Sequence, residues 1–352
     1  MSAPDSKPLV SICVPTYTGA AHLRECLDSL QAQTFRDFEV IITDDASADG
    51  TAAIAQEYAE RDARFKFHAN AGHLGLVGNW NCGIRLARGE WIKPVFQDDL
   101  LLPYCLDRML AFAREKKSRF LACRREFAFA PETAPETRQF YVESAANIER
   151  FFEKQKNVST AGFAKAIIEC VGANFLGEPT VVLMHREIFD RCGFFNEQLI
   201  MCCDSEFWYR AGTHTPVTFV RETLAVFRVH GKSTSAENFA HRRFRMDLLD
   251  PLIVLHDFLH APAYEHLRAV SRRHFGERHL EFLFRRRARL SLAVLEKDET
   301  CRAEWEAVCA AYPRLHEPVP PAGLDEKIWS VRLKYSPRRM AGRFLRALGL
   351  RK

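Results

Sequence analysis

The chain has 352 residues, enough for one large domain or two smaller ones, and its 47% apolar and 27% charged residues are ordinary for a soluble globular protein. No stretch approaches the roughly 20 apolar residues that cross a bilayer, and the opening MSAPDSKP lacks the apolar segment of a secretory signal. The net charge of +5 is modest, and the 11 cysteines contain no CxxC pair, so we expect a cytoplasmic protein with reduced thiols rather than a disulfide framework.

The first half of the chain alternates apolar strands with helices. Strands are expected at residues 10–15, 38–45, 65–68, 91–96 and 120–129. Helices are expected between them, at residues 20–33, 49–60, 79–87 and 104–115. This alternation predicts an α/β fold with a mostly parallel, twisted sheet that is covered by helices on both faces.

The second half is less regular. The pattern is helical between residues 142 and 171, and a GEPT turn at 177–180 leads into an apolar run at 181–184. Further elements are two short helices at 186–192 and 203–211, strands at 217–220 and 224–229, and charged helices at 244–259, 264–296 and 302–311. The strands therefore stop well before the end of the chain, and a helical appendage follows them.

Two expected strands end on adjacent aspartates. The strand FEVIITDD ends on Asp44 and Asp45, and WIKPVFQDD ends on Asp98 and Asp99. Open α/β sheets bind ligands at the carboxyl ends of their strands, and neighbouring carboxylates repel each other unless a cation or hydrogen-bond donors offset their charge. These pairs indicate a divalent metal site or a nucleoside contact, although each could instead cap a helix or line a solvated turn.

Three later residues are also candidates for chemistry. Asp204 follows Met-Cys-Cys, and such apolar and thiol neighbours would raise its pKa and make it a better base, although it could equally be a helix cap. His230 ends a strand, where it would ligate a metal or contact phosphate, and Lys232 would neutralise phosphate. Both could also be ordinary surface residues.

The order of these features resembles a family 2 glycosyltransferase of the inverting GT-A type. The resemblance covers about residues 8–236 and is carried by VSICVPTYTGAAHLRECLDSLQAQTF, FEVIITDDASADGT, NAGHLGLVGNWNCGIRLARGEWIKPVFQDDLLLP, FFNEQLIMCCDSEFWYRAG and LAVFRVHGKSTS. It implies a GT-A-like fold and a metal-dependent enzyme that moves a sugar from a nucleotide diphosphate sugar to an acceptor hydroxyl. Surface polysaccharide or glycolipid assembly is the expected setting, and UDP is the expected nucleotide, with dTDP and GDP as the alternatives.

The resemblance also implies roles for single residues. The nucleotide pocket would comprise Pro15, Thr16, Tyr17, Asp44, Asn70, Arg85 and, at the ribose, Asp98, with Lys232 at the diphosphate. Asp99 and His230 would hold Mn²⁺ or Mg²⁺. Asp204 would be the general base, Glu178 would bind acceptor hydroxyls, and Glu206 would share the role of base or contact the acceptor. Two positions depart from the family: Phe96 stands where an Asp is common, and Cys203 where a Glu is usual.

The end of the chain differs in charge from the rest. Residues 327–352 hold nine Lys or Arg and no acid, interspersed with apolar residues. We therefore divide the chain into a GT-A domain at 1–236, a helical region at 237–317, and a Pro-rich linker with a basic amphipathic tail at 318–352. Such a tail would rest on the anionic inner face of a plasma membrane, which fits a lipid-linked saccharide acceptor, or would be solvated.

Three other functions are compatible with parts of the sequence. A nucleotide-sugar-binding module without transferase activity fits the departures at Phe96 and Cys203. A nucleic-acid-binding protein fits the basic tail, but basic clusters interleaved with aromatic residues are not evident in the expected domain. A nucleotidyltransferase would need a glycine-rich loop with a lysine after the first strand, and residues 16–19 have no lysine.

Overall fold

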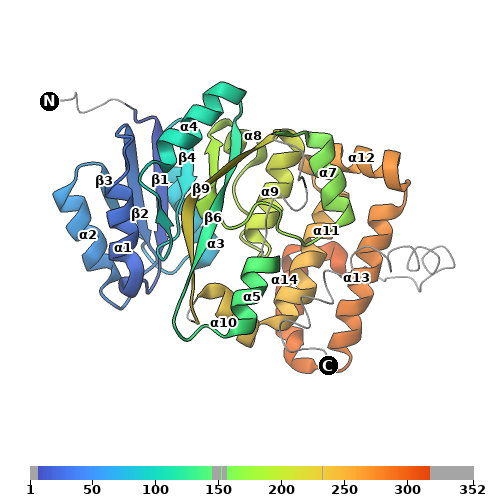
Figure 1. Cartoon of the computed structure of the whole chain (residues 1–352). Helices are drawn as coiled ribbons and strands as arrows, with labels where there is room; N and C mark the ends of the chain where they lie inside the picture. Colours follow the sequence, from blue (N-terminus) through green and yellow to red (C-terminus); the bar gives the residue numbers. More distant parts are fainter. Residues whose placement is uncertain (1–6, 145–151, 153–156, 232, 318–352) are drawn as a thin grey trace.

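The computed structural model describes residues 7–144, 152, 157–231 and 233–317 (Figure 1). Their strands form one nine-stranded sheet in the order β3-β2-β1-β4-β8-β6-β9-β5, with β7 paired to β9. The strands are β1 (Val10–Thr16), β2 (Phe38–Asp44), β3 (Phe65–Ala69), β4 (Trp91–Pro94), β5 (Leu100–Leu101), β6 (Phe120–Phe129), β7 (Asn157–Val158), β8 (Val182–His185) and β9 (Val217–Val229).

Helices separate the strands, and in the described residues only helices follow β9. Those of the sheet region are α1 (Ala20–Gln31), α2 (Thr51–Arg61), α3 (Gly75–Leu86), α4 (Cys105–Lys116), α5 (Pro135–Ser144), α7 (Thr160–Glu169), α8 (Glu187–Cys192) and α9 (Cys203–His214). The later ones are α10 (Thr234–His241), α11 (Asp250–His260), α12 (Glu265–Phe275), α13 (His279–Leu295) and α14 (Arg302–Ala311). Figure 1 shows α11, α13 and α14 gathered on the side of the molecule that carries α9.

The expected α/β class is confirmed, and the sheet is parallel where the first half of the chain builds it. Strands β3, β2, β1 and β4 all run parallel. Every residue of β2 is buried, as expected of a parallel strand covered on both faces. In the second half, β8 runs antiparallel to β4 and β6, so the sheet is mixed.

Two expected elements differ in extent from those observed. The strands expected at 217–220 and 224–229 are one continuous strand, β9, whose pairing with β6 shifts register near Arg124. The helix expected at 264–296 is interrupted at Gly276, whose φ of +101° is accessible to glycine and ends α12 before α13 begins.

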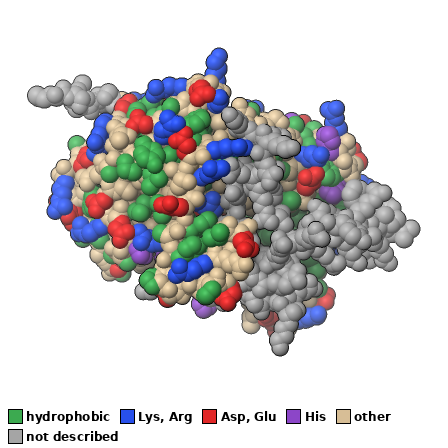
Figure 2. Space-filling model, viewed as in Figure 1, with side chains coloured by type: hydrophobic (Ala, Val, Ile, Leu, Met, Phe, Trp, Pro, Cys, Tyr) green, Lys and Arg blue, Asp and Glu red, His purple; other side chains and the backbone are tan. Residues whose placement is uncertain are grey.

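The described part of the chain has no helix that is both long and apolar enough to cross a membrane. All 11 cysteines lie within it and are free thiols, and burial raises the pKa of the Cys13 thiol to about 12. On the face drawn in Figure 2, acidic and basic side chains are intermixed among the coloured residues. The charge on that face therefore does not collect into one large patch of a single sign.

The close approach of β1 to the turn before β4 requires a glycine. A Cβ atom on Gly89 would lie 2.4 Å from the backbone nitrogen of Ser11, and the Gly89 N–H donates to Ser11 Oγ at 2.7 Å. We expect Gly89→Ala to lower the free energy of unfolding by about 2 kcal/mol or more, because backbone must move to admit the methyl group. Gly72→Ala, whose Cβ would meet open space, is the matched control. Equal denaturant midpoints for the two variants would contradict this packing.

Candidate active site

The carboxyl ends of β1 and β2 bring together the first residues that were predicted to bind a nucleotide. Thr16 and Asp44 are register partners, and Thr16 Oγ1 donates to Asp44 Oδ1 at 2.9 Å. Asp44 also accepts from the Ser47 backbone N–H at 3.0 Å and from Ser47 Oγ at 2.6 Å. The side chains of Thr16 and Asp44 are thus buried and mutually oriented, next to Pro15 at the same strand end.

The second aspartate of this pair binds the start of α3. Asp45 is almost fully buried, and its carboxylate accepts from the backbone N–H groups of Leu74 at 2.7 Å and Gly75 at 2.9 Å. Asn70 Nδ2 donates to Asp45 Oδ1 at 3.0 Å, so Asn70 joins the group as expected. The sequence analysis named Asp45 as a member of this acidic pair but gave it no individual role in the nucleotide pocket.

Tyr17 leaves the sheet and is exposed. Its side chain is 48% accessible, and its ring centroid lies 4.8 Å from that of His73, whose Nδ1 is 2.9 Å from Asp45. The amide of Gln97 ties this loop to the second acidic pair, because it accepts from the Tyr17 N–H and donates to the Tyr17 carbonyl, both at 2.9 Å. Gln97 is therefore a residue of this edge that the sequence analysis did not name.

Asp98 and His230 meet at the same edge of the sheet. Asp98 Oδ2 lies 3.0 Å from His230 Nε2, and the two side chains are 20% and 13% exposed. The ring of His22 lies beside that of His230, with centroids 4.8 Å apart. The end of β9 thus delivers a histidine to the loop after β4, although the two residues are 132 positions apart in the chain.

Asp99 points the other way. It is fully buried, and its two carboxylate oxygens accept from Thr180 Oγ1 at 2.5 Å and from the Arg228 backbone N–H at 3.1 Å. Burial, reinforced by the charge of Asp98, raises the pKa of Asp99. We expected Asp99 and His230 to hold a metal ion together. The geometry does not favour this pair, because Asp98 is the aspartate that faces His230.

Asp204 lies in the first turn of α9. Its Oδ2 accepts from Asn174 Nδ2 at 2.8 Å, and its Oδ1 accepts from the Ser205 N–H at 2.5 Å. The side chain is only partly exposed, and burial raises its pKa to about 7. A carboxyl group with this pKa exchanges its proton near neutral pH, as a general base must.

Residues 177–180 extend between the two halves of this site. The Gly177 carbonyl accepts from Asn174 Nδ2, the same amide group that binds Asp204, and from Trp208 Nε1, both at 3.1 Å. At the other end of the segment, Thr180 binds Asp99 and accepts from the Phe96 N–H at 3.2 Å. The segment therefore joins the base candidate to the second acidic pair.

Glu178, within this segment, is held by an arginine. Its Oε2 is 2.5 Å from Arg125 Nε, and its Oε1 accepts from Arg125 Nη2 at 3.1 Å. Gly177 has a φ of +109°, and a Cβ there would lie 2.9 Å from Arg125 Nη1. The glycine thus allows the arginine to pack against the segment and to orient the carboxylate of Glu178.

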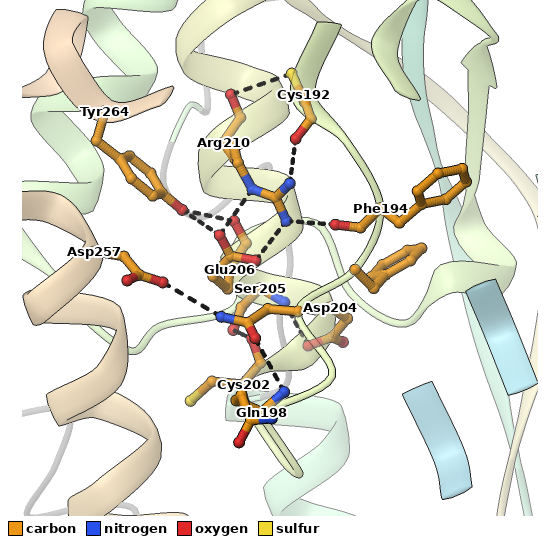
Figure 3. A network of polar contacts seen from close by, with 12 residues as sticks. Cys192, Phe194, Gln198, Cys202, Asp204, Ser205, Glu206, Arg210, Asp257 and Tyr264 are labelled. Carbon is orange, nitrogen blue, oxygen red and sulfur yellow. Dashed lines mark hydrogen bonds and ion pairs between the residues drawn. The ribbon is translucent and has the colours of Figure 1, made fainter. Parts of the chain in front are cut away.

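Two predicted site residues lie elsewhere. Arg85 is in the last turn of α3, at the opposite end from Gly75, where it packs over the Phe194 ring and lies 3.6 Å from Glu197. Glu206 is buried and binds Arg210 at 2.8 Å and the Tyr264 hydroxyl at 2.6 Å, pointing away from Asp204 (Figure 3). The structure therefore places Arg85 and Glu206 apart from the other candidate residues, and their expected roles in nucleotide binding and beside the acceptor stay predictions. Lys232 lies outside the described residues.

The C-terminal helices hold the start of α9 in place. The fully buried Asp250, at the start of α11, accepts on Oδ2 from the backbone N–H groups of three consecutive residues just ahead of α9: Ile200 at 3.0 Å, Met201 at 2.7 Å and Cys202 at 2.9 Å. Arg245 Nε lies 3.3 Å from the other oxygen of Asp250. The helical region thereby orients the turn that carries Asp204.

This anchor gives a stability prediction. Asp250→Ala removes three hydrogen bonds and leaves the buried Arg245 guanidinium without its carboxylate, so we expect the free energy of unfolding to fall by about 3 kcal/mol or more. Asp247→Ala, which removes an exposed carboxylate one turn away, should change it by about 0.5 kcal/mol or less. Urea unfolding followed by circular dichroism measures both, and a loss no larger for Asp250→Ala than for Asp247→Ala would refute the anchor.

Comparison with known proteins identifies this site's family. Residues 11–172 match the family described as Glycosyl transferase family 2, and the match contains both acidic pairs. Residues 11–172 are thus assigned to glycosyl transferase family 2. It is 29% identical over 262 residues to the uncharacterized protein MT1568 of Mycobacterium tuberculosis, covering 72% of this chain and 79% of that one. It is also 35% identical over 109 residues to the GalNAc(5)-diNAcBac-PP-undecaprenol beta-1,3-glucosyltransferase of Campylobacter jejuni, covering 31% and 35%.

Two solved structures share the fold. S. aureus TarS 1-349 in complex with UDP-GlcNAc superimposes with a TM-score of 0.57 at 18% identity, covering 88% of this chain and 81% of that one. The mannosyltransferase PcManGT from Pyrobaculum calidifontis, in complex with GDP-Man and Mn²⁺, gives a TM-score of 0.52 at 18% identity, covering 98% and 88%. The resemblance to a GT-A-like fold is thereby confirmed.

Proposed function

We propose that this glycosyltransferase moves a sugar from a UDP-sugar to an acceptor hydroxyl with inversion, in the assembly of a surface polysaccharide or glycolipid. The observation that carries the proposal is that segment 177–180 connects Asp204, through Asn174, with Asp99, whose neighbour Asp98 faces His230. Asp98 and His230 suit a leaving diphosphate, and Asp204 suits an incoming alcohol. A binding module without transferase activity would have no need of a base with a pKa of about 7.

The donor side is formed by the edge where β1, β2 and the loop after β4 end. Asp44 and Asp45 offer hydrogen-bond acceptors there, and the exposed ring of Tyr17 offers a face on which a base can stack. TarS, which shares this fold, was solved with UDP-GlcNAc, and the Campylobacter relative is named for a substrate on undecaprenol diphosphate. These names favour UDP as the nucleotide and a lipid-linked saccharide as the acceptor.

Asp98 and His230 would hold a divalent cation on the donor diphosphate. A carboxylate oxygen and an imidazole nitrogen 3.0 Å apart are donors that Mn²⁺ accepts. Among the described residues, no cluster of three or more His, Cys, Asp or Glu suits a metal ion, and a cation that also binds substrate phosphates needs only one or two side chains. When bound, it would stabilise the charge that develops on the leaving diphosphate. Asp99 would position the loop rather than ligate the cation.

Asp204 would remove the proton of the acceptor hydroxyl. Asn174 and the Ser205 N–H orient its carboxylate, and burial brings its pKa close to neutral. We also propose that residues 1–236 are the transferase domain, that 237–317 support the base through Asp250, and that the tail at 318–352, outside the described residues, contacts an anionic membrane.

The raised pKa of Asp204 predicts the pH dependence of transfer. The base acts only when deprotonated, so kcat should fall about tenfold per pH unit below pH 7 and level off above it. Asp204→Asn should lower kcat by about 10²-fold or more while UDP binding persists, and the surface variant Asp190→Asn should resemble the wild type. UDP release from UDP-GlcNAc, followed between pH 5 and pH 9, measures both effects. Retention of turnover by Asp204→Asn would exclude this residue as the base.

The proposed cation site predicts a selective loss of Mn²⁺ dependence. In Mn²⁺, Asp98→Asn and His230→Gln should each weaken UDP binding about tenfold or more, whereas in EDTA they should bind UDP like the wild type. Glu60→Gln, a remote exposed carboxylate, serves as the control. Isothermal titration calorimetry with UDP gives these affinities. If Mn²⁺ strengthens UDP binding equally in the wild type and in both site variants, the cation lies elsewhere.

A further inference from the structure

Four aromatic side chains gather beyond the Arg125–Glu178 pair, and we refer to them as the aromatic cluster. They are Phe127 and Phe129 of β6, Phe227 of β9 and Tyr141 of α5. The ring centroids of Phe127 and Tyr141 are 5.6 Å apart, and those of Phe227 and Tyr141 are 5.9 Å apart. All four side chains are partly exposed. Figure 1 shows α5 beside the end of the β6–β9 pair.

The strand register places this cluster on one face with Arg125. Phe127 and Phe227 are register partners, and Arg125 lies two residues before Phe127, so their side chains share a face of the sheet. The Arg125 guanidinium stacks on the Phe127 ring, with Cζ 4.9 Å from its centroid, while its nitrogens bind Glu178. The cluster is therefore in direct contact with the residue that orients Glu178.

A short series of contacts continues from Glu178 to the base candidate. The preceding Gly177 carbonyl and the Asp204 carboxylate accept from the same Asn174 amide nitrogen, at 3.1 Å and 2.8 Å. The charge of Glu178 contributes to the raised pKa of both Asp204 and Tyr141. The base candidate, the Glu178 carboxylate and the aromatic rings are thus connected by one continuous series of contacts.

Aromatic rings beside a fixed carboxylate suit a sugar ring. The face of an aromatic ring is negative and attracts the weakly positive C–H groups on the flat face of a pyranose. A carboxylate accepts hydrogen bonds from the hydroxyl groups at the rim of the same sugar. Burial raises the pKa of the Tyr141 phenol to about 12, so its hydroxyl stays protonated and able to donate. An aromatic cluster that served only to pack α5 would bind no saccharide. The experiment must therefore distinguish this packing role from saccharide binding.

We propose that Tyr141 and Phe227 form an acceptor subsite that stacks on one saccharide ring, while Glu178 binds its hydroxyl groups next to Asp204. This inference rests on the proposed function, because it names the class of acceptor, a pyranoside, that the transferase would use. Phe127 and Phe129 take no part in stacking, since the guanidinium groups of Arg125 and Arg138 lie over their rings, with Cζ 4.9 Å and 5.3 Å from the respective centroids.

Saturation-transfer NMR tests the subsite without knowledge of the natural acceptor. The full chain, saturated with UDP and the diamagnetic cation Mg²⁺, is mixed with methyl β-glucoside, methyl β-galactoside or methyl N-acetyl-β-glucosaminide at millimolar concentration. We expect at least one glycoside to receive saturation on its ring C–H protons. Tyr141→Ala and the more conservative Phe227→Leu should each weaken that binding about fivefold. Val142→Ala, which changes a 69% exposed neighbour on α5, should leave it unchanged.

The readouts separate the two proposals. UDP affinity, measured on the same samples, should be equal in the wild type and all three variants, which also shows that each variant is folded. If UDP binds but no glycoside receives saturation, or if the signal survives in both Tyr141→Ala and Phe227→Leu, the subsite is refuted and the transferase proposal stands. If the wild type does not bind UDP, the proposed function fails, and the acceptor subsite fails with it.

Discussion

The segment Gly-Glu-Pro-Thr at 177–180 is the physical link on which the site depends. Its two ends are hydrogen bonded to carboxylates from different parts of the chain, Asp99 through Thr180 and Asp204 through the amide of Asn174. Thr180 is almost fully buried, so neither end can shift without breaking a buried hydrogen bond. The segment therefore fixes the separation between the residues proposed for the diphosphate and the residue proposed for the acceptor.

This arrangement carries a cost in stability. The pKa values of Asp99 and Asp204 are raised above the value of 3.8 that each has in an unfolded chain. The folded state consequently binds their protons more tightly than the unfolded state does, so stability falls as pH rises from about 4 through the folded pKa, which is about 7 for Asp204. Buried carboxylates that weaken the fold at neutral pH are more typical of catalytic than of structural positions.

Local pattern was enough to predict the first half of the fold and the edge of the sheet that carries the site. Apolar strands that end on Asp44 and Asp98 needed no long-range information. Local geometry would also have placed two candidates apart from the others. Arg85 lies a full helix away from the start of α3, and Glu206, two residues after Asp204, must point to a different side of α9.

Other features depend on contacts that no local pattern records. Asp98 and Asp99 are identical in chemistry, and it is the bonds of Asp99 to Thr180 and to the Arg228 backbone on β9 that turn it inward. Asp250 reaches the turn before α9 from 48 residues away. The aromatic cluster likewise depends on the register of β6 with β9 and on the return of α5. These three contacts position the two proposed centres and the proposed acceptor subsite.

A crystal structure of the full chain with UDP and Mn²⁺ tests the central claim most directly. The account predicts Mn²⁺ bound to the Asp98 carboxylate, His230 Nε2 and the diphosphate, with the Asp204 carboxylate facing the diphosphate across a space that admits one sugar. A cation bound to Asp99 instead, or an Asp204 carboxylate turned away from the bound nucleotide, would contradict it.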